Sequence, residues 1–174
     1  IYFDYIIEEL HHANAIVEEF LFLARTKPMI LKRQKLNDIL NAISHLIQAS
    51  AVNGNKEVVF ELNEVADLLL DEKEIRQLVL NLVNNGLEAM EPGGKITVRT
   101  FMNKNDVVLT VKDEGFGIAK ENLEKIGLPF FTTKQKGTGL GLAVCYSIAA
   151  RHNAEIKIKT SPKGTTFFII FKKG

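Results

Sequence analysis

The first 24 residues carry apolar side chains in alternating steps of three and four, the spacing of a helix that packs against other helices. The stripe is formed by Phe3, Ile6, Leu10, Ala13, Val17, Phe20 and Ala24. Further apolar side chains widen it, at Ile7, Ile16, Leu21 and Leu23. Water cannot satisfy so much apolar surface, so the pattern predicts one helix of a dimeric four-helix bundle. Pro28 ends this helix and divides residues 1–27 from a second domain, residues 28–174.

Length and composition fit one globular domain with an appended element. The chain has 174 residues, 46% of them hydrophobic and 25% charged. Its 22 basic and 21 acidic residues give a net charge of +1, which argues against nucleic acid as a partner. Cys145 lies in an apolar helical run and is expected to be a buried, inert thiol. No apolar run has the length of a membrane helix, so we expect a soluble, cytoplasmic chain.

Three more helices and five strands are expected after Pro28. Helical spacing of apolar residues covers 36–51, 72–90 and 140–151. A strand rich in β-branched residues is expected at 56–62, and two hairpins at 95–102 with 106–113 and at 154–160 with 165–171. The predicted fold class is α+β, a two-layer sandwich of a mixed, mostly antiparallel sheet covered on one face by helices.

Two asparagines, Asn81 and Asn85, lie one turn apart on the predicted helix over 72–90 and therefore share a face. Asparagine is a poor interior helix residue, so its use there needs a reason. One interpretation is a pair of satisfied buried amides. The other is that the amide oxygens bind a hard cation such as Mg²⁺, which takes its other ligands from water and phosphates.

The stretch "DEGFG" begins with Asp113 at the end of a predicted strand and then places Gly115 and Gly117. A carboxylate at this position can accept a hydrogen bond from an amine of a ligand, and the glycines permit unusual turns. An acidic turn without a ligand is the alternative. Thr165 would bring its hydroxyl beside Asp113 if the two strands are neighbours.

A third segment, "LPFFTTKQKGTGLGL", combines hydroxyls, lysines and alternating glycines before a helix. They are Thr132, Thr133, Lys134, Lys136, Gly137, Gly139 and Gly141. Main-chain N–H groups at a helix start bind phosphate, and Cβ atoms would keep a polyphosphate away from them. A dinucleotide fold explains the segment less well because no parallel βαβ unit follows. The missing lysine and hydroxyl ending excludes a P-loop, whereas a plain turn remains possible for the glycines alone.

Taken in order, "LVLNLVNNGLEAM", "DEGFGI", "LPFFTTK" and "GTGLGL" resemble the N, G1, F and G2 boxes of sensor histidine kinases of two-component systems. The resemblance extends from about Leu36 to the end of the chain and is strongest to kinases of the sporulation and nitrogen-regulation type. The helix before Pro28 resembles the second helix of that family's dimerisation hairpin. The implied fold is the Bergerat fold of ATP-binding domains.

The resemblance implies an ATP site with Mg²⁺. Asn85 would coordinate Mg²⁺, Asn81 would support it, and Asn81 and Lys134 would act in the transfer. Asp113 would bind the adenine amine, with Thr165 in the same pocket. The remaining implied contacts are Gly115 and Gly117 in the pocket floor, Thr133 and Lys134 at the phosphates, and Gly137, Gly139 and Gly141 in the hinge of the lid. The segment 114–137 is expected to be mobile without nucleotide.

Asn81 separates the possible activities. The Hsp90, gyrase and MutL ATPases, and serine kinases of the same fold, resemble one another in having glutamate at this position. In the ATPases it activates water, and an amide cannot accept that proton. The sequence therefore favours phosphoryl transfer from ATP to a histidine, and from there to an aspartate of a response regulator. An ATPase, or a nucleotide-binding or partner-binding module without transfer activity, remains the alternative.

The acceptor histidine is not evident in this chain. "ELHHANA" has no acid after His12 and no proline close behind, so His11 and His12 are expected to be solvated helix residues. His45 and His152 are expected to be structural. We therefore expect the acceptor elsewhere on the hairpin of a membrane-bound parent protein, and a homodimer formed through residues 1–27. A small inhibitor protein on the hairpin is a further possible partner.

Overall fold

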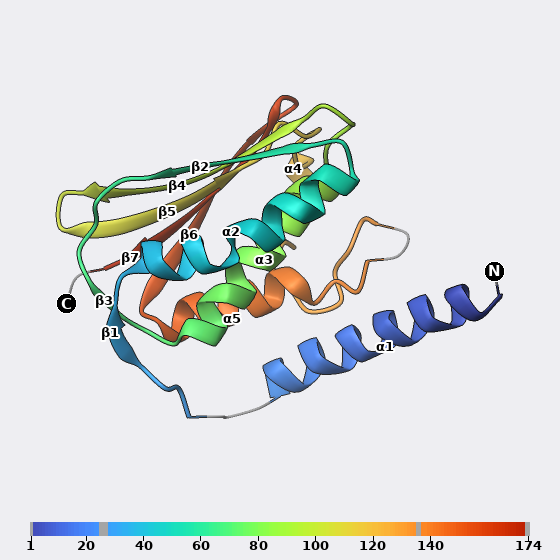
Figure 1. Ribbon diagram of the computed structural model, residues 1–174, viewed down its shortest axis with the longest axis horizontal. Helices are drawn as coiled ribbons and strands as arrows, with labels where there is room; N and C mark the ends of the chain where they lie inside the picture. Colours follow the sequence, from blue (N-terminus) through green and yellow to red (C-terminus); the bar gives the residue numbers. More distant parts are fainter. Residues whose placement is uncertain (1, 25–27, 135–136, 173–174) are drawn as a thin grey trace.

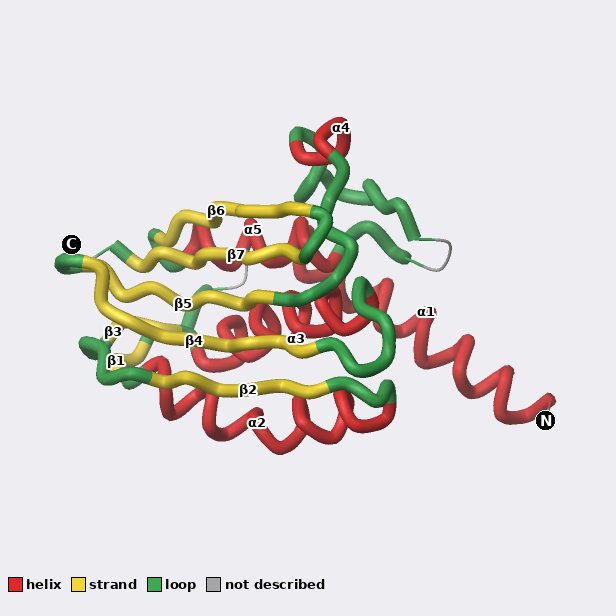
Figure 2. Tube along the Cα trace, turned by 90° about the horizontal axis from the view of Figure 1, so that it is seen from above, coloured by secondary structure: helices red, strands yellow, loops and turns green. Residues whose placement is uncertain are grey.

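The computed structural model describes residues 2–24, 28–134 and 137–172. A five-stranded sheet forms one layer (Figure 2), with the strand order β2-β4-β5-β7-β6. Its strands are β2 (Glu57–Leu62), β4 (Lys95–Asn103), β5 (Asp106–Lys112), β6 (Ala154–Ser161) and β7 (Gly164–Phe171). Only β2 and β4 pair in parallel; the other three pairs are antiparallel. The predicted fold class and both hairpins are confirmed.

Helices form the second layer on one face of this sheet (Figure 1). They are α2 (Leu36–Asn53), α3 (Glu72–Glu88) and α5 (Gly141–Arg151). The core between the layers includes Leu82 of α3, Leu109 of β5 and Ile148 of α5, each at most 1% exposed. Burial of each such side chain stabilises the fold by about 2 kcal/mol. The three periodic segments read from the sequence are therefore helices, and their apolar faces form the core.

Capping fixes where α3 begins. Asp71 precedes the helix, and its Oδ1 accepts hydrogen bonds from the N–H groups of Lys73 and Glu74 at 3.1 and 3.3 Å. This contact satisfies two of the donors that a helix leaves unpaired at its start. At the other end, α3 stops at Glu88, two residues earlier than the sequence predicted.

Three short elements were not predicted. β1 (Lys32–Gln34) pairs antiparallel with β3 (Leu68–Leu70) in a two-stranded sheet, and α4 (Lys120–Leu123) is a single turn. None is long enough to show a periodic pattern in the sequence. They connect the main layers and do not alter the order of the large elements.

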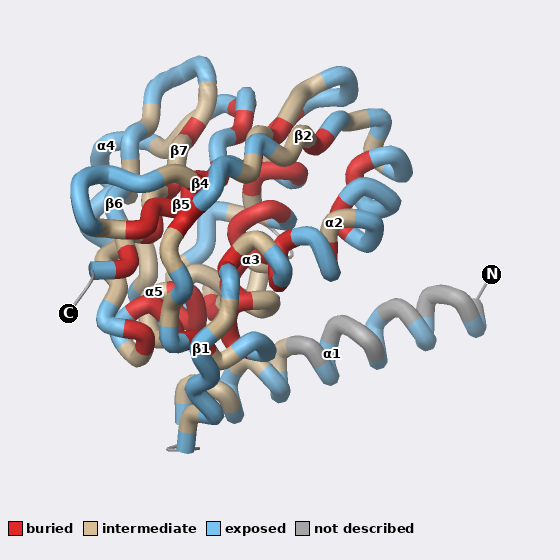
Figure 3. Tube along the Cα trace, turned by 60° about the vertical axis from the view of Figure 1, so that its left-hand side comes forward, coloured by how far each residue is buried: buried red, intermediate tan, exposed pale blue. Residues whose placement is uncertain are grey.

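The first helix, α1 (Tyr2–Ala24), extends away from the two layers (Figure 1). Figure 3 shows its described residues as mostly exposed, and Phe3 and Leu10 are 81% and 60% exposed. Among its described residues, Phe22 and Leu23 at its C-terminal end pack against the core. The predicted apolar stripe therefore faces solvent in the single chain. Among the described residues, no helix is long and apolar enough to cross a membrane.

Candidate functional site

The end of β5 lies beside the start of β7 and brings Asp113 next to Thr165. β5 and β7 pair up to Lys112 opposite Thr166, and the Asp113 N–H donates to the carbonyl of Thr165 at 2.9 Å. Asp113 is 4% exposed. Its Oδ1 accepts hydrogen bonds from the main-chain N–H groups of Gly115 and Thr165, at 2.9 and 3.1 Å. Both bonds go to Oδ1, and no hydrogen bond from the described residues reaches Oδ2, so that oxygen can accept from a ligand.

Burial raises the pKa of the Asp113 carboxyl, although the two N–H donors oppose the shift. The predicted closeness of Thr165 is confirmed, but the contact is not the one that the sequence indicated. The main-chain N–H of Thr165 touches the carboxylate, whereas its hydroxyl bonds to the Thr160 hydroxyl at 3.0 Å. Thr160 Oγ1 also accepts from the Ile118 N–H at 2.9 Å.

Glycines allow the backbone to close around this carboxylate. Gly117 has a φ of +75°, and a Cβ there would lie 2.0 Å from the carbonyl oxygen of Ser161. At Gly86 of α3, a Cβ would lie 3.1 Å from the Asp113 Cβ, so the strand end packs directly on the helix. We name the residues around this carboxylate the Asp113 corner: Gly86, Asp113, Gly115, Gly117, Thr160 and Thr165.

The two α3 amides have different partners. The Asn81 Nδ2 donates to the carbonyl of Gly141, the first residue of α5, at 3.1 Å. Asn81 therefore ties α3 to α5, which is the structural interpretation of this residue. The Asn85 Oδ1 accepts a hydrogen bond from Lys134 Nζ at 3.0 Å. This amide oxygen therefore already contacts a cation, the kind of partner that a metal site at Asn85 requires.

Lys134 Nζ also forms an ion pair with Glu88, at the C-terminal end of α3. The sequence pointed to Asn85 and Lys134, but it did not point to Glu88. The spacing of Glu88 from Asn85 puts both on one face of α3, and this was the available signal. We name these three residues the Lys134 bridge: Asn85, Glu88 and Lys134. The bridge joins α3 to the segment 128–140, which we name the lid and of which residues 135–136 are not described, Lys136 among them.

The lid glycines are explained by contacts within the protein. Gly139 has a φ of +68°, and a Cβ there would lie 2.4 Å from the carbonyl carbon of Phe130. A Cβ on Gly137 would lie 2.3 Å from Thr132 Oγ1. The sequence interpretation assigned this absence of side chains to an approaching polyphosphate. Only at Gly141, where the nearest atom would be 3.6 Å away, does the protein itself leave room for a side chain.

The two lid hydroxyls differ in position. Thr132 Oγ1 accepts from the Lys134 N–H at 3.1 Å and so shapes the turn that carries the lysine. Both residues are exposed, so exposure does not distinguish them. Thr132 differs because its hydroxyl stabilises the local backbone.

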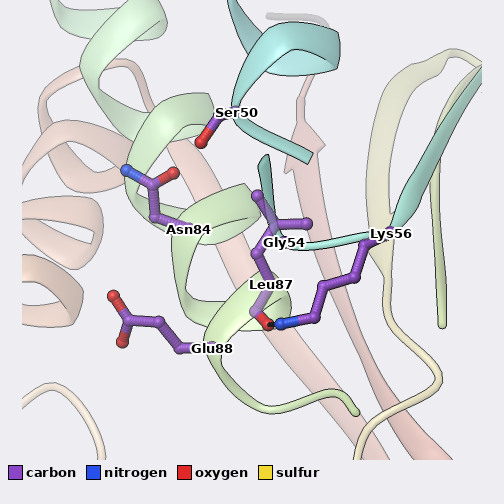
Figure 4. A pocket seen from close by; sticks show the side chains of 6 residues that line it. All are labelled: Ser50, Gly54, Lys56, Asn84, Leu87 and Glu88. Carbon is purple, nitrogen blue, oxygen red and sulfur yellow. Dashed lines mark hydrogen bonds between the residues drawn. The ribbon is translucent and has the colours of Figure 1, made fainter. Parts of the chain in front are cut away.

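An open hollow of about 190 Å³ lies between α2 and α3 (Figure 4) and shares Glu88 with the Lys134 bridge. It is lined by Ser50, Gly54, Lys56, Asn84, Leu87 and Glu88. Lys56 Nζ donates to the carbonyl of Leu87 at 2.6 Å, near the C-terminal end of α3. None of the residues predicted for the nucleotide site lines this hollow, and the lysine serves as a helix-end contact.

Cys145 and His152 match the structural roles that the sequence predicted for them, whereas the role expected of His45 is not tested. Cys145 is fully buried, and burial raises the pKa of its thiol. The His152 Nε2 accepts from the Asp71 N–H at 3.0 Å, so Nδ1 carries the proton and donates to the carbonyl of Ile148 at 2.8 Å. His45 is exposed on α2. The side chains of His11 and His12 lie outside the described residues.

Metal binding at this site cannot rest on a dense ligand cluster. Among the described residues, no group of three histidine, cysteine or acidic side chains is arranged to hold a metal ion. Mg²⁺ commonly keeps several waters and takes oxygens from a bound phosphate, so one protein amide oxygen is compatible with it. The Asn85 oxygen, with Lys134 as its present cationic partner, fits such a site.

Comparison with known proteins adds an independent view. Residues 70–174 match the family described as histidine kinase-, DNA gyrase B-, and HSP90-like ATPase. Sporulation kinase C of Bacillus subtilis (strain 168) is 36% identical over 172 residues, which cover 97% of this chain and 40% of that protein. The chain therefore spans less than half of this relative.

Solved structures agree with this match. The catalytic domain of histidine kinase ThkA has a TM-score of 0.76 and 31% identity, over 83% of this chain and 97% of that one. Histidine kinase ThkA in complex with response regulator protein TrrA has a TM-score of 0.82 and 29% identity, over 99% of this chain and 51% of that one. The chain thus belongs to the histidine kinase-, DNA gyrase B-, and HSP90-like ATPase family, and within it is homologous to sporulation kinases and sensor histidine kinases.

Proposed function

We propose that this chain binds ATP with Mg²⁺ and transfers the γ-phosphoryl group to a histidine of a dimerisation hairpin. The observation that carries the proposal is that three predicted residues, Asn81, Asn85 and Asp113, lie on α3 or pack against it. Gly86 packs on Asp113, the neighbouring Asn85 contacts the lid, and Asn81 contacts the start of α5. In this proposal, Asp113 Oδ2 accepts from the adenine amine.

The phosphates would lie between the Lys134 bridge and α5. Lys134 supplies a positive charge, Thr133 is exposed beside it, and the first turn of α5 offers main-chain N–H groups. Asn85 Oδ1 would hold Mg²⁺ once Lys134 turns toward the phosphates. When bound, the ion neutralises phosphate charge as the phosphoryl group leaves. The protein itself aligns the nucleotide and excludes water from it.

Transfer is favoured over hydrolysis by the chemistry of Asn81. A base that activates water must accept a proton, and a carboxamide does not. Its Nδ2 is engaged with Gly141, which gives the residue a positioning role between α3 and α5. The histidine acceptor is itself a nucleophile, so its attack needs no base at this position.

The partners follow from α1 and from the relatives. The exposed apolar stripe of α1 supports homodimerisation through residues 1–27, with residues 28–174 as the ATP-binding domain. A solved ThkA structure contains a response regulator protein, and we propose such a regulator as the final acceptor here. A small inhibitor protein on the hairpin would act through the same stripe. We place this chemistry in the cytoplasm, where ATP is available.

Incubation with γ-labelled ATP, Mg²⁺ and a separately prepared hairpin that carries an acceptor histidine tests this function. We expect label on the hairpin histidine and little free phosphate. Asn85→Ala should abolish the label, whereas Asn105→Ala, in the exposed turn after β4, should not. Phosphate release without labelled hairpin would favour the ATPase alternative. Nucleotide binding with neither product would favour a binding module.

A further inference from the structure

The end of α1 holds the lid at two points. Glu19 Oε2 accepts a hydrogen bond from the hydroxyl of Thr138 at 2.9 Å. The next residue, Phe20, lies with its ring centroid 6.5 Å from that of Phe130. Within the lid, the Phe130 N–H donates to the carbonyl of Gly139 at 3.0 Å, which brings the two contact points together. The docked end of α1 therefore covers the base of the lid.

Glu19 also places a negative charge against the start of α5. A Cβ built on Gly141 would lie 3.6 Å from Glu19 Oε1 and 3.7 Å from Asn81 Nδ2, so the carboxylate and the amide flank the same residue. The N-cap residue of α5, Leu140, makes no side-chain capping bond, and its N–H donates at 3.1 Å to the same Thr138 hydroxyl that contacts Glu19. The positive end of a helix dipole stabilises a carboxylate and a phosphate for the same reason.

We propose that Glu19 is an internal competitor for the phosphates of the nucleotide. Docking of the end of α1 and binding of a polyphosphate at the start of α5 would then exclude one another. Two anions at one helix end repel, and only one of them can be stabilised there. This inference rests on the proposed function, because the ligand concerned is the one proposed above.

A positive side chain occupies the proposed cation position just as Glu19 occupies the proposed phosphate position. Lys134 Nζ contacts Asn85 Oδ1, the oxygen proposed for the cation, while Glu19 lies at the helix turn proposed for the phosphates. Binding is therefore an exchange of internal charges for ligand charges. Because coupling between two sites is reciprocal, the position of α1 sets nucleotide affinity, and nucleotide in turn releases α1.

Calorimetric titration of the full chain with MgATP and with adenosine tests this inference. Glu19→Gln keeps the size of the side chain and an oxygen for Thr138, but it removes the charge. We expect the variant to bind MgATP about threefold to tenfold more tightly. Adenosine, which has no phosphate, should bind with unchanged affinity. Glu18→Gln makes the same charge change at the adjacent exposed position and controls for net charge.

Equal effects of Glu19→Gln and Glu18→Gln on MgATP affinity would overturn the inference while leaving the proposed function intact. Equal gains for MgATP and adenosine would also overturn it, since the phosphates would not be involved. Absence of MgATP binding by the unaltered chain and by both variants would overturn the proposed function, and the inference with it.

A second measurement follows α1 itself. Amide hydrogen exchange of residues 16–24 should become faster when MgATP is added to the unaltered chain, and adenosine should have no such effect. In Glu19→Gln, exchange should already be faster without ligand. Unchanged exchange of these residues in all three cases would contradict the proposed exclusion.

Discussion

The Asp113 corner and the Lys134 bridge both contact α3, through Gly86 and through Asn85 and Glu88, but they are held by different forces. The Asp113 carboxylate is buried and fixed by main-chain N–H groups at the end of a strand pair. The bridge is made by side chains of α3 and the lid, and the Lys134 and Glu88 side chains are 36% and 59% exposed. Sheet pairing therefore builds the first region, whereas the second consists of charged contacts that a ligand can replace.

This difference assigns the adenine base of the proposed ligand to the Asp113 corner and its phosphates to the Lys134 bridge. A rigid, buried carboxylate suits the adenine base, which is neutral and has a fixed shape. Exposed charged side chains suit phosphates, because they can form charged hydrogen bonds and move as the phosphate charge changes during the reaction. Variants of the corner should therefore affect adenosine and MgATP alike, and variants of the bridge should affect MgATP alone.

Among variants that keep the Asp113 carboxylate, the largest effect is expected from Gly117→Ala, which closes the Asp113 corner. The new Cβ would meet the Ser161 carbonyl at 2.0 Å, and the nearby backbone must shift. We expect calorimetry to show affinity for both ligands lowered at least about 30-fold, corresponding to ~2 kcal/mol of overpacking. Gly93→Ala is the matched control, because Gly93 also has a positive φ of 90° but has no atom within 4 Å of the new Cβ. Equal losses in the two variants would show that backbone strain alone is responsible.

Lys134→Met should separate the two ligands. Loss of the ammonium removes a charged hydrogen bond, so MgATP affinity should fall about tenfold, or ~1.4 kcal/mol. Adenosine affinity should not change. Lys120→Met, at an exposed position of α4, is the control for loss of one positive charge. A parallel loss of adenosine affinity would show that the bridge also shapes the Asp113 corner.

A smaller effect is expected from Thr165→Val. The variant keeps the N–H that contacts Asp113 but loses the hydroxyl that bonds to Thr160. One lost hydrogen bond is worth about 1 kcal/mol, so both affinities should fall about fivefold and by the same factor. Thr166→Val, the next residue of β7, is the control. If the affinity for MgATP falls much more than the affinity for adenosine, the Asp113 corner contacts the phosphates as well as the adenine base.

The smallest effect concerns stability and pH. Burial raises the pKa of Asp113 above its ordinary value of 3.8, so the folded carboxyl holds its proton more tightly than the unfolded one. The free energy of unfolding then loses this contribution as pH rises through the interval between the two pKa values. Asp113→Asn does not titrate. Its Tm relative to the unaltered chain should therefore be higher at pH 7 than at pH 3.5, and an opposite trend in thermal unfolding would contradict the assigned burial.

The sequence predicted most of the fold because its large elements have local signals. The helical spacing of Leu78, Leu82 and their neighbours and the β-branched strands each mark one element, and the order of the elements matches the four boxes. The sheet of β1 and β3 has no such signal, since strands of three residues show no period. The resemblance to sensor histidine kinases is confirmed by the relatives.

The nucleotide site stays a prediction, and the contacts of its residues could not be read from the sequence. Asp113, Asn81 and Asn85 do come together around α3. Three contacts depend on distances that only the folded chain defines. They are the ion pair of Lys134 with Glu88, the bond from the Thr165 N–H to Asp113, and the close packing around Gly139. The approach of Glu19 to Gly141 joins residues 122 positions apart, and no local pattern encodes it.

Calorimetric titration of MgATP into the unaltered chain and into Asp113→Asn tests the central claim most directly. The amide retains an oxygen for the N–H groups of Gly115 and Thr165, so the fold should survive, but its nitrogen at the Oδ2 position would repel the adenine amine. We predict measurable binding by the unaltered chain and a loss of at least about 100-fold in the variant. Asp67→Asn, at an exposed position, should bind normally. Equal affinity of the unaltered chain and Asp113→Asn, or no binding by the folded unaltered chain, would contradict an ATP site at Asp113.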